Sequence, residues 1–274
     1  MRKTRLGIIC VAVVVLTTPV AAQSRYPRPN KGIEAPLSWL QQFNGAYVRP
    51  QDKPDGTVRP TANLIGPMDG IIIPLLQPWA ALRREATNFE LEEDGEVCRP
   101  TGLLLAHANR AFYLAAAPGR LTFIGDRPNT AAIRRIYLDR GHLKNPPLTS
   151  WGDSIAYREG ETLVIDTIGF DDKSFLSLDA TRHSTELHIV ERWTLVANGK
   201  YLEKVWIVDD PRALKAPFTF TRYHAKMPPD FRHPEEPCAS TPDVWRAWTT
   251  IHNDAADFYA EKRAAEAKAL IQKK

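Results

Sequence analysis

The stretch of sequence that decides the fold is HIVERWTLVANGKYLEKVWIVD, residues 188–209. Its two halves are strand-like, and the Asn198-Gly199 pair between them is the strongest short-range signal for a β-hairpin with a two-residue type I′ turn. When residues are paired outward from that turn, His188 lies directly opposite Asp209. The stretch therefore predicts two long antiparallel strands, with a histidine and a carboxylate facing each other at their far end.

Further strand-like segments precede and follow this hairpin. Pro118-Gly119 and Glu159-Gly160 are two more tight links between strand-like runs. The predicted strands are 111–117, 120–126, 132–138, 153–158, 161–169, 185–197, 200–209 and 217–225. Strands joined mostly by hairpins favour a mainly β fold with an antiparallel meander, and closure into a β-barrel removes the exposed edges. An open sheet and a two-sheet sandwich are the competing architectures.

The segments before and after the strands have patterns of their own. Residues 23–110 are rich in Pro and Gly in their first part and predict an extended arm, followed by a helix over 78–92. Residues 241–260 predict a C-terminal amphipathic helix with Thr241 as its N-cap. The length of residues 23–274 lies within the range of one domain, so we expect a single β-barrel domain.

The first 22 residues predict a cleavable signal peptide. Basic residues precede an apolar run from Leu6 to Leu16, and Val20-Ala21-Ala22 offers small residues for cleavage before Gln23. The apolar run is much shorter than the roughly 20 residues of a transmembrane helix, which disfavours an uncleaved anchor. We therefore expect a periplasmic or secreted protein.

Cleavage of the signal peptide also changes the net charge. The whole chain has 36 basic and 32 acidic residues, but three of the basic ones lie in the signal peptide, so the mature chain has a net charge of +1. This balance gives no reason to expect nucleic acid or, after cleavage, a membrane as a partner. In an oxidising compartment the two remaining cysteines, Cys98 and Cys238, are candidates for a disulfide bond, with two separate buried thiols as the alternative.

The polar face of the 188–209 hairpin carries the first candidate catalytic residues. Glu186 lies two residues from His188 and on the same face, so the histidine has carboxylate neighbours. A carboxylate beside an imidazole fixes its tautomer and raises its basicity, as a general base requires. The opposite face is apolar except for one carboxylate and reads Leu187, Ile189, Glu191, Trp193 and Leu195.

A second carboxylate pair follows from the turn at Glu159-Gly160. Pairing outward from a two-residue turn at these positions places Asp153 directly opposite Asp166. In an enclosed place, repulsion between two carboxylates raises the pKa of one of them, which can then act as an acid. A bulge that separates the two residues, or exposure of both to solvent, is the alternative.

Other residues of this region are weaker candidates. His183 and His188 point to opposite faces of a strand and lack the spacing of a metal site, so we expect no metal. Trp151 and Tyr157 are candidates for lining a site for an apolar or aromatic ligand, with core packing as the alternative. Ser154 lacks the G-x-S-x-G context of a hydrolase nucleophile. No P-loop or GxGxxG motif is present, so we expect no cofactor.

Motifs in the second half of the chain resemble those of a large family of secreted, mostly uncharacterised bacterial proteins. The matching segments are 134–139 (RRIYLD), 150–154 (SWGDS), 159–170 (EGETLVIDTIGF), 183–192 (HSTELHIVER) and 209–211 (DDP), and residues 98–102 match a C-x-P-x-G turn. The family reads R-x-I-Y-x-D-G-R-x-H-P, W-x-G-H-S, G-D-T-L-V-V-D-T-x-G-F and H-S-E-x-L-H-x-x-E-R. The resemblance implies a lipocalin-like β-barrel and no particular activity.

This chain departs from the family pattern in two places. Residues 139–143 (DRGHL) scramble the D-G-R-x-H-P pattern, and Asp153 stands where the family has His. If that histidine is catalytic in the relatives, the activity here is altered or has passed to Asp153. The positions that do match are Trp151, Ser154, Asp166, His183, Glu186, His188, Glu191 and Arg192.

The expected function is that of an exported small-molecule enzyme. Its catalytic residues would be His188, Asp166, Glu186, His183 and Asp153, and its substrate-binding residues Trp151, Ser154, Tyr157, Glu191 and Arg192. Acid–base catalysis on a small apolar or aromatic substrate suits an isomerase, a cyclase or a lyase, because none of these needs a cofactor. A non-catalytic lipocalin-like binder or carrier is the alternative, and a structural surface protein is a third possibility.

Overall fold

The structure is a computed structural model that describes residues 35–50, 54, 71–87, 102–106, 111–125, 132–177 and 181–232. The predicted signal peptide, Cys98, Cys238 and the predicted helix over 241–260 lie outside these residues. The strands are β1 (Gly45–Val48), β2 (Phe112–Ala117), β3 (Arg120–Gly125), β4 (Ala132–Tyr137), β5 (Asp153–Glu159), β6 (Thr162–Ile168), β7 (His188–Val196), β8 (Tyr201–Asp209) and β9 (Phe218–Lys226). The helices are α1 (Leu37–Leu40), η1 (Gln41–Phe43), η2 (Ile73–Leu75), α3 (Pro78–Ala86) and α5 (Leu103–Ala106).

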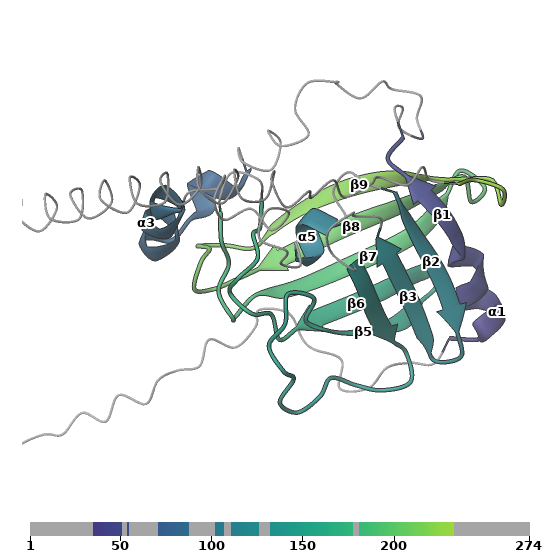
Figure 1. Cartoon of the computed structure of the whole chain (residues 1–274), viewed down its shortest axis with the longest axis horizontal. Helices are drawn as coiled ribbons and strands as arrows, with labels where there is room; N and C mark the ends of the chain where they lie inside the picture. The colour runs from purple at the N-terminus through teal and green to yellow at the C-terminus, as the bar shows by residue number, and fades with distance from the viewer. Residues whose placement is uncertain are drawn as a thin grey trace, which may run out of the picture.

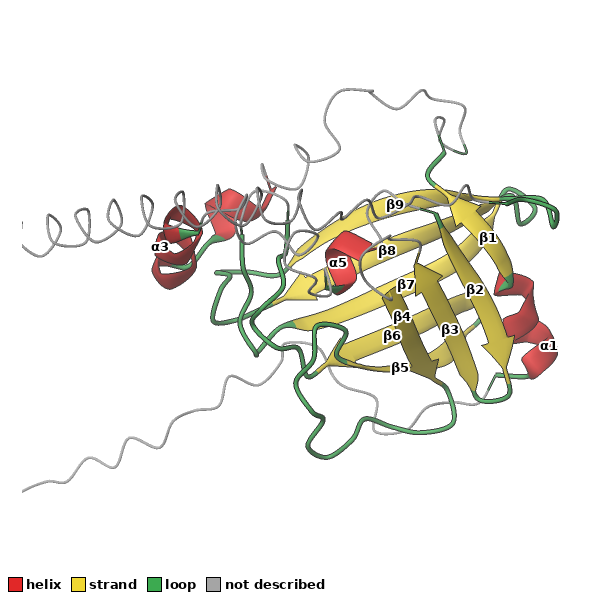
Figure 2. Ribbon diagram, viewed as in Figure 1, coloured by secondary structure: helices red, strands yellow, loops and turns green. Residues whose placement is uncertain are grey.

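The strands form one closed, lipocalin-like β-barrel in which neighbours along the chain are neighbours in space (Figure 1). The prediction of a mainly β, closed barrel is therefore confirmed. Each predicted strand has a counterpart within a few residues. The helices lie at the two ends of the barrel, with α1 beside β1 and β2 and with α3 beyond the opposite end (Figure 2).

The predicted antiparallel meander of eight strands differs from the structure in two respects. The barrel has a ninth strand, β1, which comes from the segment predicted to be an extended arm. The β4–β5 pair is parallel, whereas every other pair is antiparallel. An odd number of strands cannot close with every neighbour antiparallel, so one parallel pair is required. The chain makes it with a long crossover, residues 138–152, along the outside of the barrel.

The register of the β7–β8 hairpin agrees with the sequence prediction. His188 is paired with Asp209, and the ladder continues to Val196 opposite Tyr201. Asn198 and Gly199 both have positive φ, of 56° and 79°. Positive φ at both central residues is the requirement of a type I′ turn. A two-residue turn signal was therefore sufficient to place a histidine opposite a carboxylate, each of them ten residues from the turn.

The register of the β5–β6 hairpin differs from the prediction by two residues. Glu159 is paired with Thr162, so the loop is Gly160-Glu161, and Asp153 lies opposite Ile168 instead of Asp166. The reason is local, because Gly160 has a φ of +61° and the II′ turn places Gly at the first central position. A shift of two residues keeps Asp153 and Asp166 on the same face of the sheet, on diagonal positions.

The core of the barrel identifies its inner face. One buried cluster joins residues of β1 to β8: Tyr47, Phe112, Leu114, Leu121, Phe123, Ile136, Ala156, Leu163, Ile165, Trp193 and Leu202. Side chains from so many neighbouring strands can meet only inside the barrel. A second cluster, which includes Ile189, Trp206 and Phe218, joins the other end of the barrel to α3 and α5.

The predicted helix over 78–92 is shorter in the structure. It begins at Pro78, as the proline in the first turn indicates, but ends at Ala86, and Thr87 has extended backbone angles. The Thr87 hydroxyl donates a hydrogen bond to the carbonyl oxygen of Arg83 at 2.8 Å. Among the described helices, none is both long and apolar enough to cross a bilayer.

The two glycines that flank β5 allow a matched test of backbone strain. Gly160 and Gly152 have nearly equal φ, +61° and +66°, but a Cβ at Gly160 meets nothing, whereas a Cβ at Gly152 lies 2.7 Å from the carbonyl oxygen of Ile168. We expect Gly160→Ala to cost about 1–2 kcal/mol of unfolding free energy, the cost of the left-handed conformation alone. Gly152→Ala should cost about 1–3 kcal/mol more, because the backbone must move. Urea unfolding measures both, and equal losses would contradict the steric argument.

Candidate functional site

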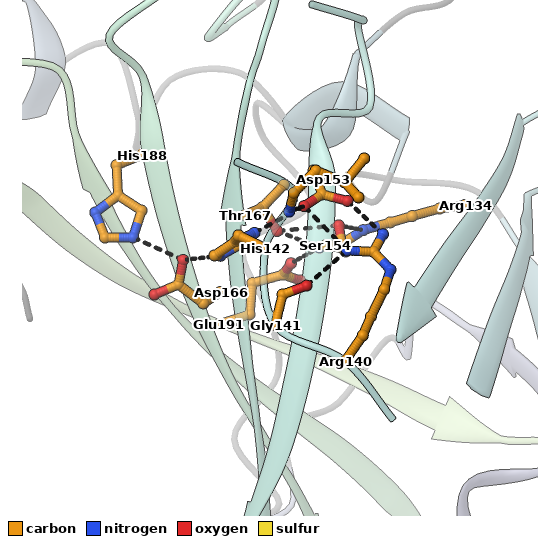
Figure 3. A network of polar contacts seen from close by, with 11 residues as sticks. Arg134, Arg140, Gly141, His142, Asp153, Ser154, Asp166, Thr167, His188 and Glu191 are labelled. Carbon is orange, nitrogen blue, oxygen red and sulfur yellow. Dashed lines mark hydrogen bonds and ion pairs between the residues drawn. The ribbon is translucent and has the colours of Figure 1, made fainter. Parts of the chain in front are cut away.

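A chain of histidines and carboxylates lies where the 138–152 crossover passes β5 and β6 (Figure 3). His142 lies between two carboxylates, with Nδ1 at 3.0 Å from Oδ2 of Asp153 and Nε2 at 2.9 Å from Oδ1 of Asp166. The same Oδ1 of Asp166 is 3.0 Å from Nε2 of His188. We call these residues, His142, Asp153, Asp166 and His188, the histidine–carboxylate cluster.

Asp153 is the anchor of the crossover. Its Oδ1 accepts a hydrogen bond from Nη2 of Arg140 at 2.5 Å, and its Oδ2 accepts one from the backbone N–H of Leu143 at 3.1 Å. Arg140 also stacks on the ring of Tyr137, with Cζ 3.9 Å from the ring centroid. These contacts fix the backbone on both sides of His142, so they fix where its imidazole lies.

The cluster lies on the outer face of the barrel wall. Leu163 and Ile165 point into the core, so Asp166, next along β6, points out. His188 is outward for the same reason, because Ile189 and Trp193 are inner residues. The outward side chains are nonetheless covered, since Asp166 and His188 are each 2% exposed. A polar network on the outside of a barrel is thus shielded from water.

Hydrogen bonding decides the protonation of the cluster. Burial raises the pKa of Asp166, but hydrogen bonds from His142 and His188 outweigh it, and the net pKa is lowered. Burial is likewise outweighed at Asp153, where His142, Arg140 and the N–H of Leu143 hold the pKa far below its usual range. Because each ring nitrogen of His142 faces a carboxylate oxygen, the site favours the protonated imidazolium of His142, in which both nitrogens donate.

The pKa of His142 gives a prediction about stability against pH. Burial lowers this pKa, but the bonds to Asp153 and Asp166 raise it more, so the folded value lies above 6.5. A raised pKa contributes stability that is complete below the unfolded value and is lost as pH rises through the folded value. We therefore expect the melting temperature to fall as pH rises above about 6.5, and we expect His142→Gln to remove most of that fall.

Thermal unfolding of native and His142→Gln protein across pH 5–9 measures this effect, and an equal fall of the melting temperature in both proteins would contradict the prediction.

At acid pH the two carboxylates are expected to have the opposite effect on stability. Asp153 and Asp166 have lowered pKa values, so their contribution is present above the usual carboxyl pKa and is lost as pH falls below it.

Asp209 extends the cluster on the far side of His188. The two residues are directly paired across β7 and β8. Asp209 is 1% exposed, and within the described part of the chain neither of its carboxylate oxygens has a hydrogen-bond partner. A buried carboxylate without donors is costly, and a positive charge on His188 would reduce that cost.

A second polar cluster lies on the inner face of the same strands. Arg134 of β4 donates to Oγ of Ser154 at 2.9 Å and to Oγ1 of Thr167 at 2.8 Å, and its Nη2 is 2.6 Å from Oε1 of Glu191. Glu191 also accepts a hydrogen bond from Nε1 of Trp193 at 3.0 Å. Ser154 and Thr167 directly follow Asp153 and Asp166 in sequence, so the two clusters lie on opposite sides of one wall.

Lys204 is buried on this inner face. Its Nζ lies 4.5 Å from the ring centroid of Phe112, 5.3 Å from that of Trp193 and 5.8 Å from that of Trp206. Burial lowers the pKa of Lys204 well below its usual value; Glu191 opposes this effect, and Arg222 and Arg134 add to it. The inner face therefore places basic side chains among aromatic rings.

The structure brings some predicted site residues together and separates others. His188, Asp166 and Asp153 meet in the histidine–carboxylate cluster, and Tyr157 and Arg192 lie on the same outer face. Arg192 is paired with Glu159. Glu186, in contrast, is an exposed residue in the turn before β7.

Four predicted residues lie elsewhere. Ser154 and Glu191 belong to the inner cluster, and Trp151 packs against the core, with its ring centroid 6.3 Å from that of Phe123. His183 is buried in the loop before β7, where its Nε2 is 2.9 Å from Oγ of Ser174 and its Nδ1 is 3.0 Å from the carbonyl oxygen of Ser184. Burial lowers the pKa of His183, so a neutral ring that holds the loop is its role in the fold.

Sequence reasoning missed His142 and Arg140. The signal was present, because the only long connection between strand candidates 132–138 and 153–158 carries an arginine and a histidine. Both residue types also occur, in the same order, in the D-G-R-x-H-P pattern of the family that the chain resembles. Lys204 and Arg134 were missed as well, although each interrupts the apolar face of a strand as Glu191 does.

No group of three or more His, Cys, Asp or Glu side chains is arranged to hold a metal ion within the described ranges. Arg140 and the imidazolium of His142 already satisfy Asp153. The arrangement of the outer cluster is instead one of proton donors and acceptors in a line, with ionised carboxylates between the imidazoles.

Comparison of the chain with family models, with curated proteins and with solved structures finds no match.

Proposed function

We propose that this chain is an exported acid–base enzyme of the isomerase, cyclase or lyase type, with His188 as its proton-transferring residue. The observation that supports the proposal is the shared Oδ1 of Asp166, 3.0 Å from Nε2 of His188 and 2.9 Å from Nε2 of His142. An ionised carboxylate in this position accepts from Nε2, so in neutral His188 the lone pair is on Nδ1. That nitrogen is the base.

The reaction moves one proton. Nδ1 of His188 takes a proton from the substrate, and the imidazolium that results is stabilised by Asp166 on one side and Asp209 on the other. Return of the proton to another substrate atom completes an isomerisation. Delivery of the proton to a departing hydroxyl completes a dehydration. Neither step consumes an oxidant or needs a cofactor.

His142 acts on the base through Asp166. As an imidazolium between two carboxylates, it keeps Asp166 ionised and its orientation fixed. The low exposure of the cluster strengthens these interactions, because the local dielectric constant is low. His142 is therefore a positioning residue in this proposal.

The residues around the cluster favour an apolar or aromatic substrate. Leu143, which follows His142 in the sequence, and Leu148, further along the same crossover, are 46% and 55% exposed. Tyr157 lies on the same outer face as Asp166. Burial raises the pKa of the Tyr157 phenol, and the charges of Glu159 and Asp166 raise it further. Exposed apolar side chains beside a buried polar cluster are typical of a ligand-binding surface.

An untargeted conversion assay tests the proposal. The purified mature protein is incubated with an apolar extract of cells, and products are followed by liquid chromatography and mass spectrometry. We expect a compound to disappear as an isomer of equal mass, a dehydrated product or a pair of cleavage fragments appears. His188→Asn protein should leave the extract unchanged. Equal conversion by both proteins, or binding of a compound that is recovered unaltered, would favour the non-catalytic binder.

A further inference from the structure

A run of twelve residues at one end of the barrel, residues 71–82, is almost entirely apolar. It reads IIIPLLQPWAAL, and Gln77 is the only residue in it with a hydrophilic side chain. The run forms η2 and the first half of α3, beyond the end of the barrel opposite α1 (Figure 2). A helical segment that is apolar all round needs an apolar environment on more than one side.

One side of the run attaches it to the barrel. Ile72, Leu76 and Ala80 are buried in the second core cluster. The backbone N–H of Gln77 donates a hydrogen bond to the carbonyl oxygen of Ala213 at 2.8 Å. These contacts fix the run on the loop after β8 without any help from its remaining apolar side chains.

The other side of the run is exposed. Ile71, Ile73 and Leu82 are 39%, 43% and 58% exposed. Among the residues that the structure describes, seven large apolar side chains are exposed, and three of them lie in this run. We call Ile71, Ile73, Trp79 and Leu82 the η2–α3 surface. Exposed apolar side chains that gather in one segment are typical of a surface that binds a partner or a membrane.

Basic side chains border the η2–α3 surface. The guanidinium groups of Arg83 and Arg212 lie over the indole of Trp79, with Cζ 5.4 Å and 5.1 Å from the ring centroid. Arg212 is exposed, and so is Lys173, which directly follows the partner of Arg83, Asp172. Exposed cations beside exposed apolar groups suit a partner that is both apolar and anionic.

The acidic side chains nearby are mostly engaged within the protein. Asp172 pairs with Arg83 at 3.4 Å. Asp171 accepts hydrogen bonds from Oγ of Ser150 at 3.1 Å and from the backbone N–H of Lys173 at 3.0 Å. Glu85 is the one acidic residue of α3. The border of the surface therefore presents a modest excess of positive charge.

We infer that the η2–α3 surface docks on an anionic lipid membrane, with Ile71, Ile73 and Leu82 among the upper acyl chains and Arg212 at the lipid phosphates. The amphipathic ring of Trp79 fits the headgroup level between them. Protein interfaces carry hydrogen bonds along with apolar contacts, whereas residues 71–82 offer a single hydrophilic side chain, which suits acyl chains better.

The reason for this inference is local. The net charge of the mature chain gives no reason to expect a membrane, but attraction to anionic lipid depends on the basic residues near the contact. No residue of the η2–α3 surface belongs to the histidine–carboxylate cluster, so the inference does not rest on the proposed activity.

Sedimentation with lipid vesicles tests the inference on purified protein without its predicted signal peptide, which is itself apolar. Vesicles of phosphatidylglycerol and phosphatidylcholine in equal parts are compared with vesicles of phosphatidylcholine alone. We expect clear binding to the anionic vesicles and weaker binding to the neutral ones. Arg212→Gln should lower binding to the anionic vesicles about fivefold, the usual effect of one basic residue near such a surface, and should leave binding to the neutral ones unchanged.

A matched pair of leucine variants locates the contact. Leu82→Glu should lower binding to the anionic vesicles by about tenfold or more, because it removes an inserted apolar group and adds a charge that the lipid repels. Leu148→Glu, the same change at a leucine of the crossover that is 55% exposed, is the control and should bind as native protein does. Circular dichroism verifies that both variants, which alter exposed side chains, keep the fold.

Three results would overturn the inference. The first is absence of binding of native protein to the anionic vesicles. The second is an equal loss of binding in Leu82→Glu and Leu148→Glu, which would place the contact elsewhere. The third is a dimer of native protein in size-exclusion chromatography that Leu82→Glu dissociates, because a second copy of the chain would then cover the surface.

Discussion

Replacement of His188 by asparagine is expected to lower the turnover number by about 10²- to 10⁴-fold on the substrate identified by the conversion assay, the usual contribution of a general base. Asparagine preserves most of the volume and keeps a donor for Asp166, which otherwise loses one of its two imidazole partners. The Michaelis constant should change little, because the lost interaction develops during proton transfer. Steady-state kinetics of native and variant protein make the measurement.

The control for this variant is Val190→Ala. Val190 lies on the same strand and the same outer face, one pleat further along, and carries no ionisable group. It should lower stability and leave turnover within a few-fold of native. Full turnover in His188→Asn would refute the acid–base role. If the variant instead unfolds while Val190→Ala does not, His188 is a structural partner of Asp209, and the carrier function gains support.

Glu191→Gln is expected to destabilise the protein by about 3–5 kcal/mol, the cost of removing one partner from a buried ion pair. The pair with Arg134 has an O–N distance of 2.6 Å, and the two side chains are 0% and 1% exposed. Loss of the carboxylate charge leaves Arg134 with neutral acceptors alone and leaves Lys204 without its stabilising charge. Urea unfolding monitored by tryptophan fluorescence gives the free energy.

A matched glutamate provides the comparison. Glu159 pairs with Arg192 on the outer face, and its side chain is 54% exposed. Surface ion pairs contribute about 0–1 kcal/mol, so Glu159→Gln should stay within that range. A loss below about 1 kcal/mol for Glu191→Gln as well would mean that the inner charge is hydrated or otherwise compensated.

The two halves of the candidate site differ in how far sequence reasoning could reach. Short-range turn rules placed His188 opposite Asp209, because the Asn-Gly turn sets the register of the whole hairpin. The same rule failed at the β5–β6 hairpin, where Glu159-Gly160 and Gly160-Glu161 are both plausible loops and Gly160 decides between them by its φ. The predicted and observed registers differ by two residues, which is one full pleat, so Asp153 and Asp166 lie on the same face of the sheet in both.

By itself, the sequence determined the alternation of the strands, their approximate bounds and the face on which each ionisable residue lies, because these follow from a period of two residues and from local turn chemistry. Only the tertiary structure decided which ionisable residues come into contact with one another. Closure of a nine-stranded barrel requires a parallel pair, which here is β4–β5. The crossover between these two strands runs over the outer face of the barrel and brings His142 to Asp153 and Asp166. Such a contact joins residues that are distant in register, and no local rule of spacing encodes it. Likewise, the face that holds His188 became the outside of the barrel only when the strands closed around Trp193 and its neighbours.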